Sequence, residues 1–411
     1  MTSKTAERGT IGLFSLPVIV GALGYFVDVY DILLFSAVRT QSLRDIGVAE
    51  LDLISVGVTI INLQLIGMIL GGAFFGMLGD KIGRVKLLFA SILTYSAATF
   101  GCAFVQDVAT YAALRFIAGF GLAGELGLAL TLVSELMDRH KRGYGNTLVA
   151  AFGVTGVIFA GLAAQWMPWR DCYLLGGIMG LMLLILRVRM AESFMLLELS
   201  NHVKRGNLWM MFANWDRIKR FMAVVFTAGP CLFATWLMGT FAPEVTKAMG
   251  LSNPIKASEA LIVTYIGIAV GELFIGYVSQ KLQTRRKVLI ASLCAFAAMA
   301  GWFLFMPHAD NRNLFLAYYA VMGATTGYFV LSIMIGVELF GTNLRATAGT
   351  MAPNLMRATF VPMSIAMTYL KEPMGLIGAV TLVAAVSFVL ALWAASQLRE
   401  TYGIPLDYVE K

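Results

Sequence analysis

Two short charged signatures each occur twice in this chain, at the ends of long apolar runs. The first is GMLGDKIGRVK at 76–86, and its second copy is GYVSQKLQTRRK at 276–287. The other is ELMDRHKR at 135–142, and its second copy is ELFGTNLR at 338–345. The copies begin 200 and 203 residues apart. Such a repeat in so apolar a chain predicts two similar membrane bundles joined head to tail.

The composition indicates a membrane protein. Of the 411 residues, 59% are hydrophobic and 13% are charged, which is more apolar surface than a soluble chain can bury. Apolar stretches of about 18 residues or more, long enough to span a bilayer, recur throughout. We predict an all-α membrane protein with twelve transmembrane helices at 12–38, 50–79, 85–105, 107–135, 142–168, 170–190, 218–243, 257–281, 286–306, 311–337, 346–370 and 374–398.

The longest polar interruption divides the chain. Residues 1–190 are predicted to form an N-terminal six-helix bundle, and residues 218–411 a C-terminal six-helix bundle with a short tail. The linker at 191–217 combines basic residues with Trp209 and Trp215, which fits a helix on the inner membrane surface. A plain flexible linker fits equally well.

The net charge of +7 is distributed as in a membrane protein rather than a nucleic-acid-binding protein. With the N-terminus placed inside, 22 of the 31 Lys and Arg residues lie on the inner side and 7 on the outer side. This bias predicts that both termini are cytoplasmic and that the basic residues meet anionic lipid. No short apolar region with a cleavage site follows Lys4 and Arg8, so we expect no cleavable signal peptide.

The sequence shows no motif typical of an enzyme active site. The histidines share no metal-ligand spacing, and the cysteines form no CxxC pair and lie in or beside apolar runs. We therefore expect no catalytic residue, metal site or cofactor.

Taken together, the motifs resemble the major facilitator superfamily. GMLGDKIGRVK is similar to its loop between the second and third spans, and the two Glu–Arg pairs resemble its motifs after spans four and ten. RFIAGFGLAGELG (115–127) and YFVDVYD (25–31) resemble the sugar-porter and metabolite–proton symporter branches. The resemblance implies two bundles that rock around a central substrate site. It also implies a cytoplasmic gate made by Gly76, Asp80, Lys81, Gly83, Arg84, Lys86, Glu135, Arg142, Glu338 and Arg345.

Two departures from the family pattern matter. The second copy of the first signature has Gln280 where the first has Asp80, and it lacks the central Gly. The fifth span lacks the internal Gly-Pro pair that resembles drug–proton antiporters, since Pro168 stands only at its end. The second departure favours import over efflux.

Six charged residues lie inside predicted spans, where each costs about 2.5–3.5 kcal/mol if isolated. They must therefore face water or one another. They are Asp28, Asp31, Arg115, Glu125, Glu272 and Arg357.

Asp28 and Asp31 are the predicted proton carriers. They lie three positions apart and share one face of the first helix. A carboxylate with a like charge nearby can load and release a proton in each cycle. The alternative is that one or both pair permanently with an Arg of another helix.

Arg357 is the predicted substrate anchor, because a guanidinium matches a carboxylate or phosphate. A fixed salt bridge to Asp28 or Asp31 is the alternative. Arg115 is a further candidate for the substrate or proton site, against a structural ion pair. The predicted cavity lining adds Asn354, Tyr25 and Tyr30, while Glu125 and Glu272 are candidates for coupling or for packing and gating.

The expected activity is proton-coupled import of a small organic anion such as a carboxylate by a multi-pass protein of a bacterial inner membrane. Its partners would be the substrate, protons and the lipid bilayer, without nucleic acid, and the monomer would be functional. A sugar or polyol porter, an exporter and a non-transporting membrane sensor remain alternatives.

Overall fold

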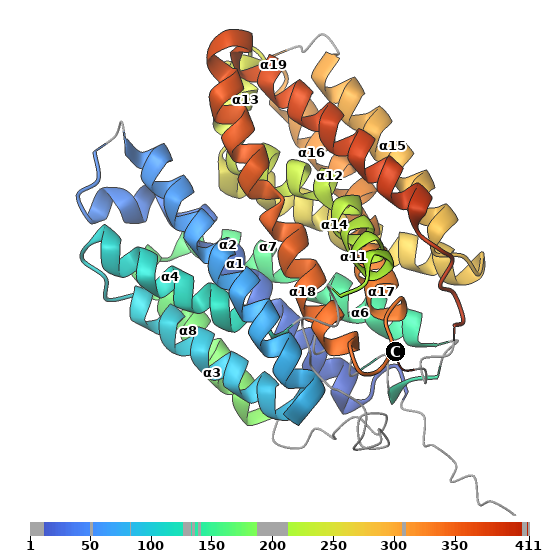
Figure 1. Ribbon diagram of the computed structural model, residues 1–411. Helices are drawn as coiled ribbons and strands as arrows, with labels where there is room; N and C mark the ends of the chain where they lie inside the picture. Colours follow the sequence, from blue (N-terminus) through green and yellow to red (C-terminus); the bar gives the residue numbers. More distant parts are fainter. Residues whose placement is uncertain are drawn as a thin grey trace, which may run out of the picture.

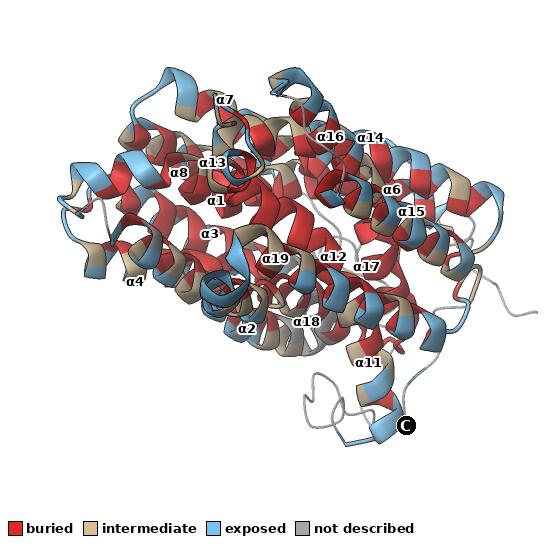
Figure 2. Ribbon diagram, turned by 90° about the horizontal axis from the view of Figure 1, so that it is seen from above, coloured by how far each residue is buried: buried red, intermediate tan, exposed pale blue. Residues whose placement is uncertain are grey.

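The computed structural model describes residues 12–49, 52–82, 84–125, 133, 136–138, 141–186, 213–305, 310–404 and 409. Within these ranges every regular element is a helix. Figure 1 shows the N-terminal helices (blue to green) as one bundle beside a second bundle of the C-terminal helices (yellow-green to red). Buried residues fill the middle of both bundles, and exposed ones lie along their outer surfaces (Figure 2).

The N-terminal bundle accounts for the first six predicted spans. Two of its helices, α3 and α4, are apolar but shorter than a full crossing within the described residues. The fifth span is interrupted once, between α6 and α7 at Val154. The helices are α1 (Leu16–Asp45), α2 (Leu53–Ile82), α3 (Arg84–Cys102), α4 (Val108–Leu122), α6 (Arg142–Gly153), α7 (Thr155–Trp166) and α8 (Trp169–Leu186).

The C-terminal bundle contains the other six predicted spans. The seventh span begins earlier than predicted, at Trp215, and most of the predicted linker lies outside the described residues. The helices are α11 (Trp215–Thr227), α12 (Gly229–Leu232), the π-helix η3 (Phe233–Met238), α13 (Ala242–Ala248), α14 (Ala257–Lys281), α15 (Arg286–Phe305), α16 (Arg312–Thr325), the 3₁₀ helix η4 (Thr326–Tyr328), α17 (Phe329–Glu338), α18 (Arg345–Ala358) and α19 (Phe360–Gln397).

The last two spans join at a bend inside α19. Gly375 there has a φ of 71°, a left-handed conformation that glycine adopts without penalty. Pro373 precedes it and cannot donate a backbone hydrogen bond. Large apolar side chains of α19, such as Trp393, face outward, which suits contact with lipid.

The two bundles repeat the same backbone-to-backbone contact. A Cβ added to Gly71 would lie 2.1 Å from the carbonyl oxygen of Phe120, and one added to Gly271 would lie 2.1 Å from that of Ala324. Small residues allow this approach where lipid gives helices little other reason to associate. The contact joins α2 to α4 through Gly67, Gly71 and Gly119, and α14 to α16 through Gly267, Gly271 and Gly323. The repeat read from the charged loops is thus also a repeat of packing.

Adding a methyl group at this contact should destabilise the protein. In Gly271→Ala the new Cβ meets backbone atoms, which cannot move aside, so we expect a loss of about 1–3 kcal/mol and a lower melting temperature of the purified protein. Gly301→Ala is the control, because nothing lies within 4 Å of a Cβ there. Equal melting of the two variants would contradict the backbone contact.

Candidate functional site

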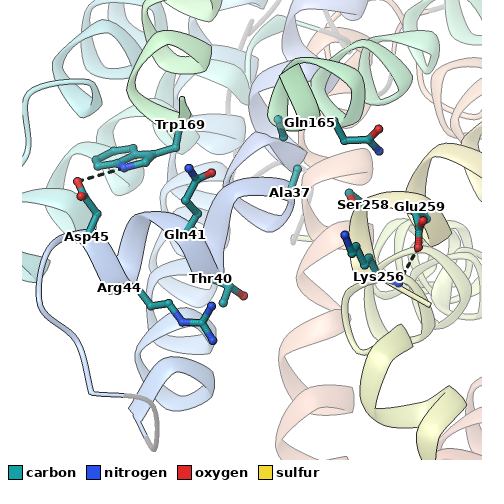
Figure 3. A pocket seen from close by; sticks show the side chains of 11 residues that line it. Ala37, Thr40, Gln41, Arg44, Asp45, Gln165, Trp169, Lys256, Ser258 and Glu259 are labelled. Carbon is teal, nitrogen blue, oxygen red and sulfur yellow. Dashed lines mark hydrogen bonds between the residues drawn. The ribbon is translucent and has the colours of Figure 1, made fainter. Parts of the chain in front are cut away.

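A wide vestibule opens between the two bundles at the end of the molecule where α1 ends and α14 begins. Its volume is about 920 Å³. The charge bias predicts that this is the outer end. Its lining is mostly polar (Figure 3): Ala37, Thr40, Gln41, Arg44, Asp45, Ala164, Gln165, Trp169, Lys256, Ser258 and Glu259.

Ion pairs fix the walls of this vestibule. Asp45 accepts hydrogen bonds from the indole Nε1 of Trp169 at 3.2 Å and from Arg170 at 3.0 Å. On the opposite wall, Glu259 accepts from the backbone N–H of Lys256 at 3.0 Å and from Arg312 at 2.5 Å. These contacts hold one carboxylate in place on each wall.

A second, much smaller cavity lies between the bundles nearer the centre of the spans. Its volume is about 40 Å³, against about 920 Å³ for the vestibule. It is therefore narrow in this conformation. Its lining is Tyr25, Val29, Ile32, Leu33, Val154, Cys231, Leu232, Thr235, Trp236, Tyr265, Ile268, Glu272, Phe329 and Arg357.

The bundles are in direct contact at the predicted inner end. The amide nitrogen of Asn354 on α18 donates to the carbonyl oxygen of Ala123 at 2.9 Å. Gly276 on α14 lies so close to Thr147 on α6 that an added Cβ would be 2.3 Å from the Thr147 hydroxyl. Among the described residues, the bundles are thus apart at the vestibule and touch at the other end.

Asp31 pairs with Arg115 inside the N-terminal bundle. Nη1 of Arg115 lies 3.2 Å from Oδ1 of Asp31, and both side chains are fully buried. The guanidinium also donates to Thr99 at 3.2 Å and to the sulfur of Cys102 at 3.3 Å, and it stacks over the ring of Tyr173. In this conformation Asp31 is therefore paired with an Arg of another helix, which was the alternative to its role as a proton carrier.

Arg357 is in the central cavity, as predicted for the substrate anchor. Its Nη1 donates to Oδ1 of Asn354 at 3.2 Å. Arg357 therefore touches the side chain that makes the contact between the bundles. Its charge also acts on the hydroxyl of Tyr25, another lining residue. The structure thus brings three of the five predicted substrate residues together.

The other two lie elsewhere. Arg115 is held by Asp31, and the hydroxyl of Tyr30 donates to the carbonyl oxygen of Cys172 at 2.8 Å. Neither belongs to the cavity lining, so their placement favours a structural role over substrate contact. Asp28 and Glu125 are fully buried, and the charge of Asp28 acts on Tyr25.

Part of the predicted cytoplasmic gate can be located. Glu338 and Arg345 are both buried. Glu338 forms an ion pair with Arg285 at 3.5 Å, and the hydroxyl of Thr401 donates to it at 2.7 Å. Lys86 is exposed. Of the remaining gate residues, Gly83 and Glu135 lie outside the described residues. The others lie in described helices, but their side chains or surroundings are not described: Gly76, Asp80, Lys81, Arg84 and Arg142.

Sequence reasoning missed several cavity residues. Cys231, Thr235 and Trp236 come from the seventh span, where α12 passes into the π-helix η3. A π-turn changes the helical register and often marks a functional site. Nothing in the periodicity indicates it, although Pro230 signals an irregular helix.

Sequence reasoning also missed Arg285, the ion-pair partner of Glu338, although it stands in the repeated loop QTRRK. The backbone N–H of Arg285 donates to Glu400 at 2.8 Å, which ties the C-terminal segment to the start of α15. Partial burial opposes ionisation of Glu400, but hydrogen bonds from Thr284 and from this N–H lower its pKa.

Comparison with known proteins agrees with this architecture. The Major Facilitator Superfamily model matches residues 16–359. The chain belongs to the major facilitator superfamily. This assignment confirms the resemblance read from the motifs and makes the protein a multi-pass membrane transporter rather than an enzyme.

Relatives and solved structures of this superfamily cover nearly the whole chain. The sialic acid transporter NanX of Escherichia coli is 24% identical and covers 86% of each chain. The cis,cis-muconate transport protein of Acinetobacter baylyi is 28% identical and covers 87% of this chain and 89% of its own. The proton:xylose symporter XylE superposes with a TM-score of 0.75 at 18% identity, over 95% of this chain and 97% of its own. The predicted fold, twelve helices in the major facilitator arrangement, is confirmed.

The buried pair should matter more to stability than an exposed one. Asp31→Asn leaves the Arg115 charge buried without its counter-charge, and such a loss costs about 3–5 kcal/mol. Asp45→Asn removes the half-exposed pair with Arg170 and should cost about 0–1 kcal/mol. Melting temperatures of the purified variants test this, and a larger drop for Asp45→Asn would overturn the ranking.

Proposed function

We propose that this secondary transporter imports small organic anions together with protons, and that the preferred anionic group is a carboxylate. The observation that carries the proposal is the position of Arg357. It is the one cation among the described residues that line the central cavity, and it lies where the two bundles meet. A planar guanidinium with five donors suits a carboxylate held in two hydrogen bonds.

The chemistry of the relatives supports this choice. Sialic acid and cis,cis-muconate, the molecules named for two of them, are both carboxylic acids. A neutral sugar such as xylose has no negative charge to place on Arg357. The likeness to the xylose symporter concerns the fold alone, so it does not favour a sugar.

Proton coupling is assigned to the first helix. Protonation of Asp31 would remove the charge that holds Arg115, and α1 would then be free to shift against α4. Because Tyr25 on α1 also lines the cavity, such a shift can change the shape of the substrate site. A ligand drives a transition of this kind only through its different affinity for the two states.

The charge balance sets the driving force. A monoanion that moves with one proton is electroneutral, so the membrane potential, about 2.3 kcal/mol per charge at 100 mV, would contribute nothing. Uptake would then depend on the pH difference alone. The vestibule at the predicted outer end is the side from which the substrate would bind.

Substituting the anchor should weaken substrate binding. Arg357→Lys loses a hydrogen bond to a charged group, worth about 1.5–3 kcal/mol, so the half-saturating concentration for cis,cis-muconate or sialic acid uptake into proteoliposomes should rise about 10- to 100-fold. Arg399→Lys, an exposed position, is the matched control. Wild-type affinity in Arg357→Lys would exclude two-point anchoring.

Neutralising the carboxylates of α1 should separate proton-driven uptake from exchange. Asp28→Asn and Asp31→Asn are expected to lose accumulation driven by an imposed pH gradient, while exchange of labelled for unlabelled substrate persists because it needs no net proton movement. Both reactions are measured in the same proteoliposomes. If both variants keep full pH-driven uptake, α1 does not carry the proton.

A further inference from the structure

Glu272 is a buried acid in the wall of the substrate cavity, and the coupling scheme above does not use it. Its side chain is 1% exposed, and α14 places it in the lining of the central cavity with Arg357. No described residue donates a hydrogen bond to its Oε2. An ionised carboxylate in that state costs several kcal/mol, whereas a neutral acid costs much less.

The repeat shows that packing does not require this acid. The close contact of α14 with α16 has its counterpart in the contact of α2 with α4, where Gly267 and Gly271 correspond to Gly67 and Gly71. The same offset of 200 residues places Gly72 at the position of Glu272. One copy of this helix pair therefore packs with no side chain where the other carries a carboxyl group.

The groups around Glu272 are mostly neutral. Its charge acts on the hydroxyl of Tyr25 on α1 and on the thiol of Cys231 on α12, and the charge of Arg357 acts on the same two groups. Tyr265 on α14 also lines the cavity, and Tyr328 lies in η4, which packs against α14. The charge of Asp28 also acts on Tyr25.

Of the helices packed on α14, α1 carries charges within its length, Asp28, Asp31 and Arg39. The other charges of these helices stand near helix ends: Arg44 and Asp45 on α1, Arg142 on α6, Glu244 and Lys247 on α13, Arg286 and Lys287 on α15, Arg312 on α16 and Glu338 on α17. Among the described lining residues, Arg357 and Glu272 thus set the charge of the cavity.

We propose that Glu272 is a second proton site, which couples proton and anion through the charge of the cavity they share. With Glu272 protonated, Arg357 gives the cavity one positive charge and it attracts an anion. With Glu272 ionised, the two residues neutralise each other and an anion is repelled by the carboxylate. Release of the proton on the inner side therefore expels the anion, and the empty cavity returns without net charge.

This inference rests on the proposed transport of anions, so the test separates the two. The first measurement needs no substrate: infrared difference spectra of the purified protein between low and high pH, in which a protonated carboxyl group gives its own carbonyl band. We expect a band that is lost in Glu272→Gln and kept in Glu259→Gln, the matched change in the vestibule. If no band depends on Glu272, the proposal is wrong.

The second measurement counts protons taken up when an anion binds. Calorimetric titration with cis,cis-muconate in buffers of different ionisation enthalpy gives this number, at a pH above that at which the infrared band disappears, so that Glu272 starts ionised. Glu272→Gln should then take up about one proton fewer than the wild type because the amide cannot titrate. Binding itself should survive, since glutamine resembles the protonated acid. An unchanged proton count in Glu272→Gln would overturn the proposal.

Two further arms keep the outcomes distinct. Glu272→Gly reproduces the residue of the other repeat and serves if Glu272→Gln fails to fold; it should show the same loss of one proton. If the wild type binds neither cis,cis-muconate nor sialic acid, the proposed substrate class fails for these acids, and the infrared band alone decides the role of Glu272.

Discussion

The burial of charge within the spans is the constraint on which the rest of this structure depends. Arg115 and Asp31 are both sealed from solvent, and each is tolerated because the other is 3.2 Å away. Thr99, Cys102 and Tyr173 surround the guanidinium and satisfy it further. The pair joins α1 to α4, so the arrangement of the N-terminal bundle and the charge state of one carboxyl group are physically linked.

The two bundles share their packing but not their chemistry. The glycine contacts of α2 with α4 recur between α14 and α16. The charged loops recur, but these charged positions within the spans do not: Tyr319 stands 204 residues after Arg115, the offset that separates Gly119 from Gly323, and Gly72 stands 200 residues before Glu272. The repeated glycine contacts hold together the helices of both bundles. Each of these charges within the spans occurs in one bundle only, so it is not needed for this packing.

Much of this could be read from the sequence, for reasons that differ between residues. The spans follow from hydropathy, and the common offset of the charged loops predicted the duplicated bundles because each copy stands at the end of a long apolar run. Arg357 was predicted to face the cavity because a charge within a span needs water or a counter-charge. The partner of Asp31 could not be chosen between Arg115 and Arg357, since helix rotation decides which face meets which. The sequence did not indicate that three residues of the seventh span line the cavity, because a π-turn breaks the helical period. They are Cys231, Thr235 and Trp236.

The number of proton sites decides which force drives transport. One proton per monoanion leaves the membrane potential without effect, whereas two protons carry one net positive charge inward and add about 2.3 kcal/mol per 100 mV. Asp31 lies within one bundle and Glu272 lines the cavity between both. As proton sites, the two carboxyl groups would therefore respond to different events: movement of α1 against α4, and occupation of the cavity. A carrier with both sites can accumulate its anion even where the pH difference is small, at the cost of a second proton in each cycle.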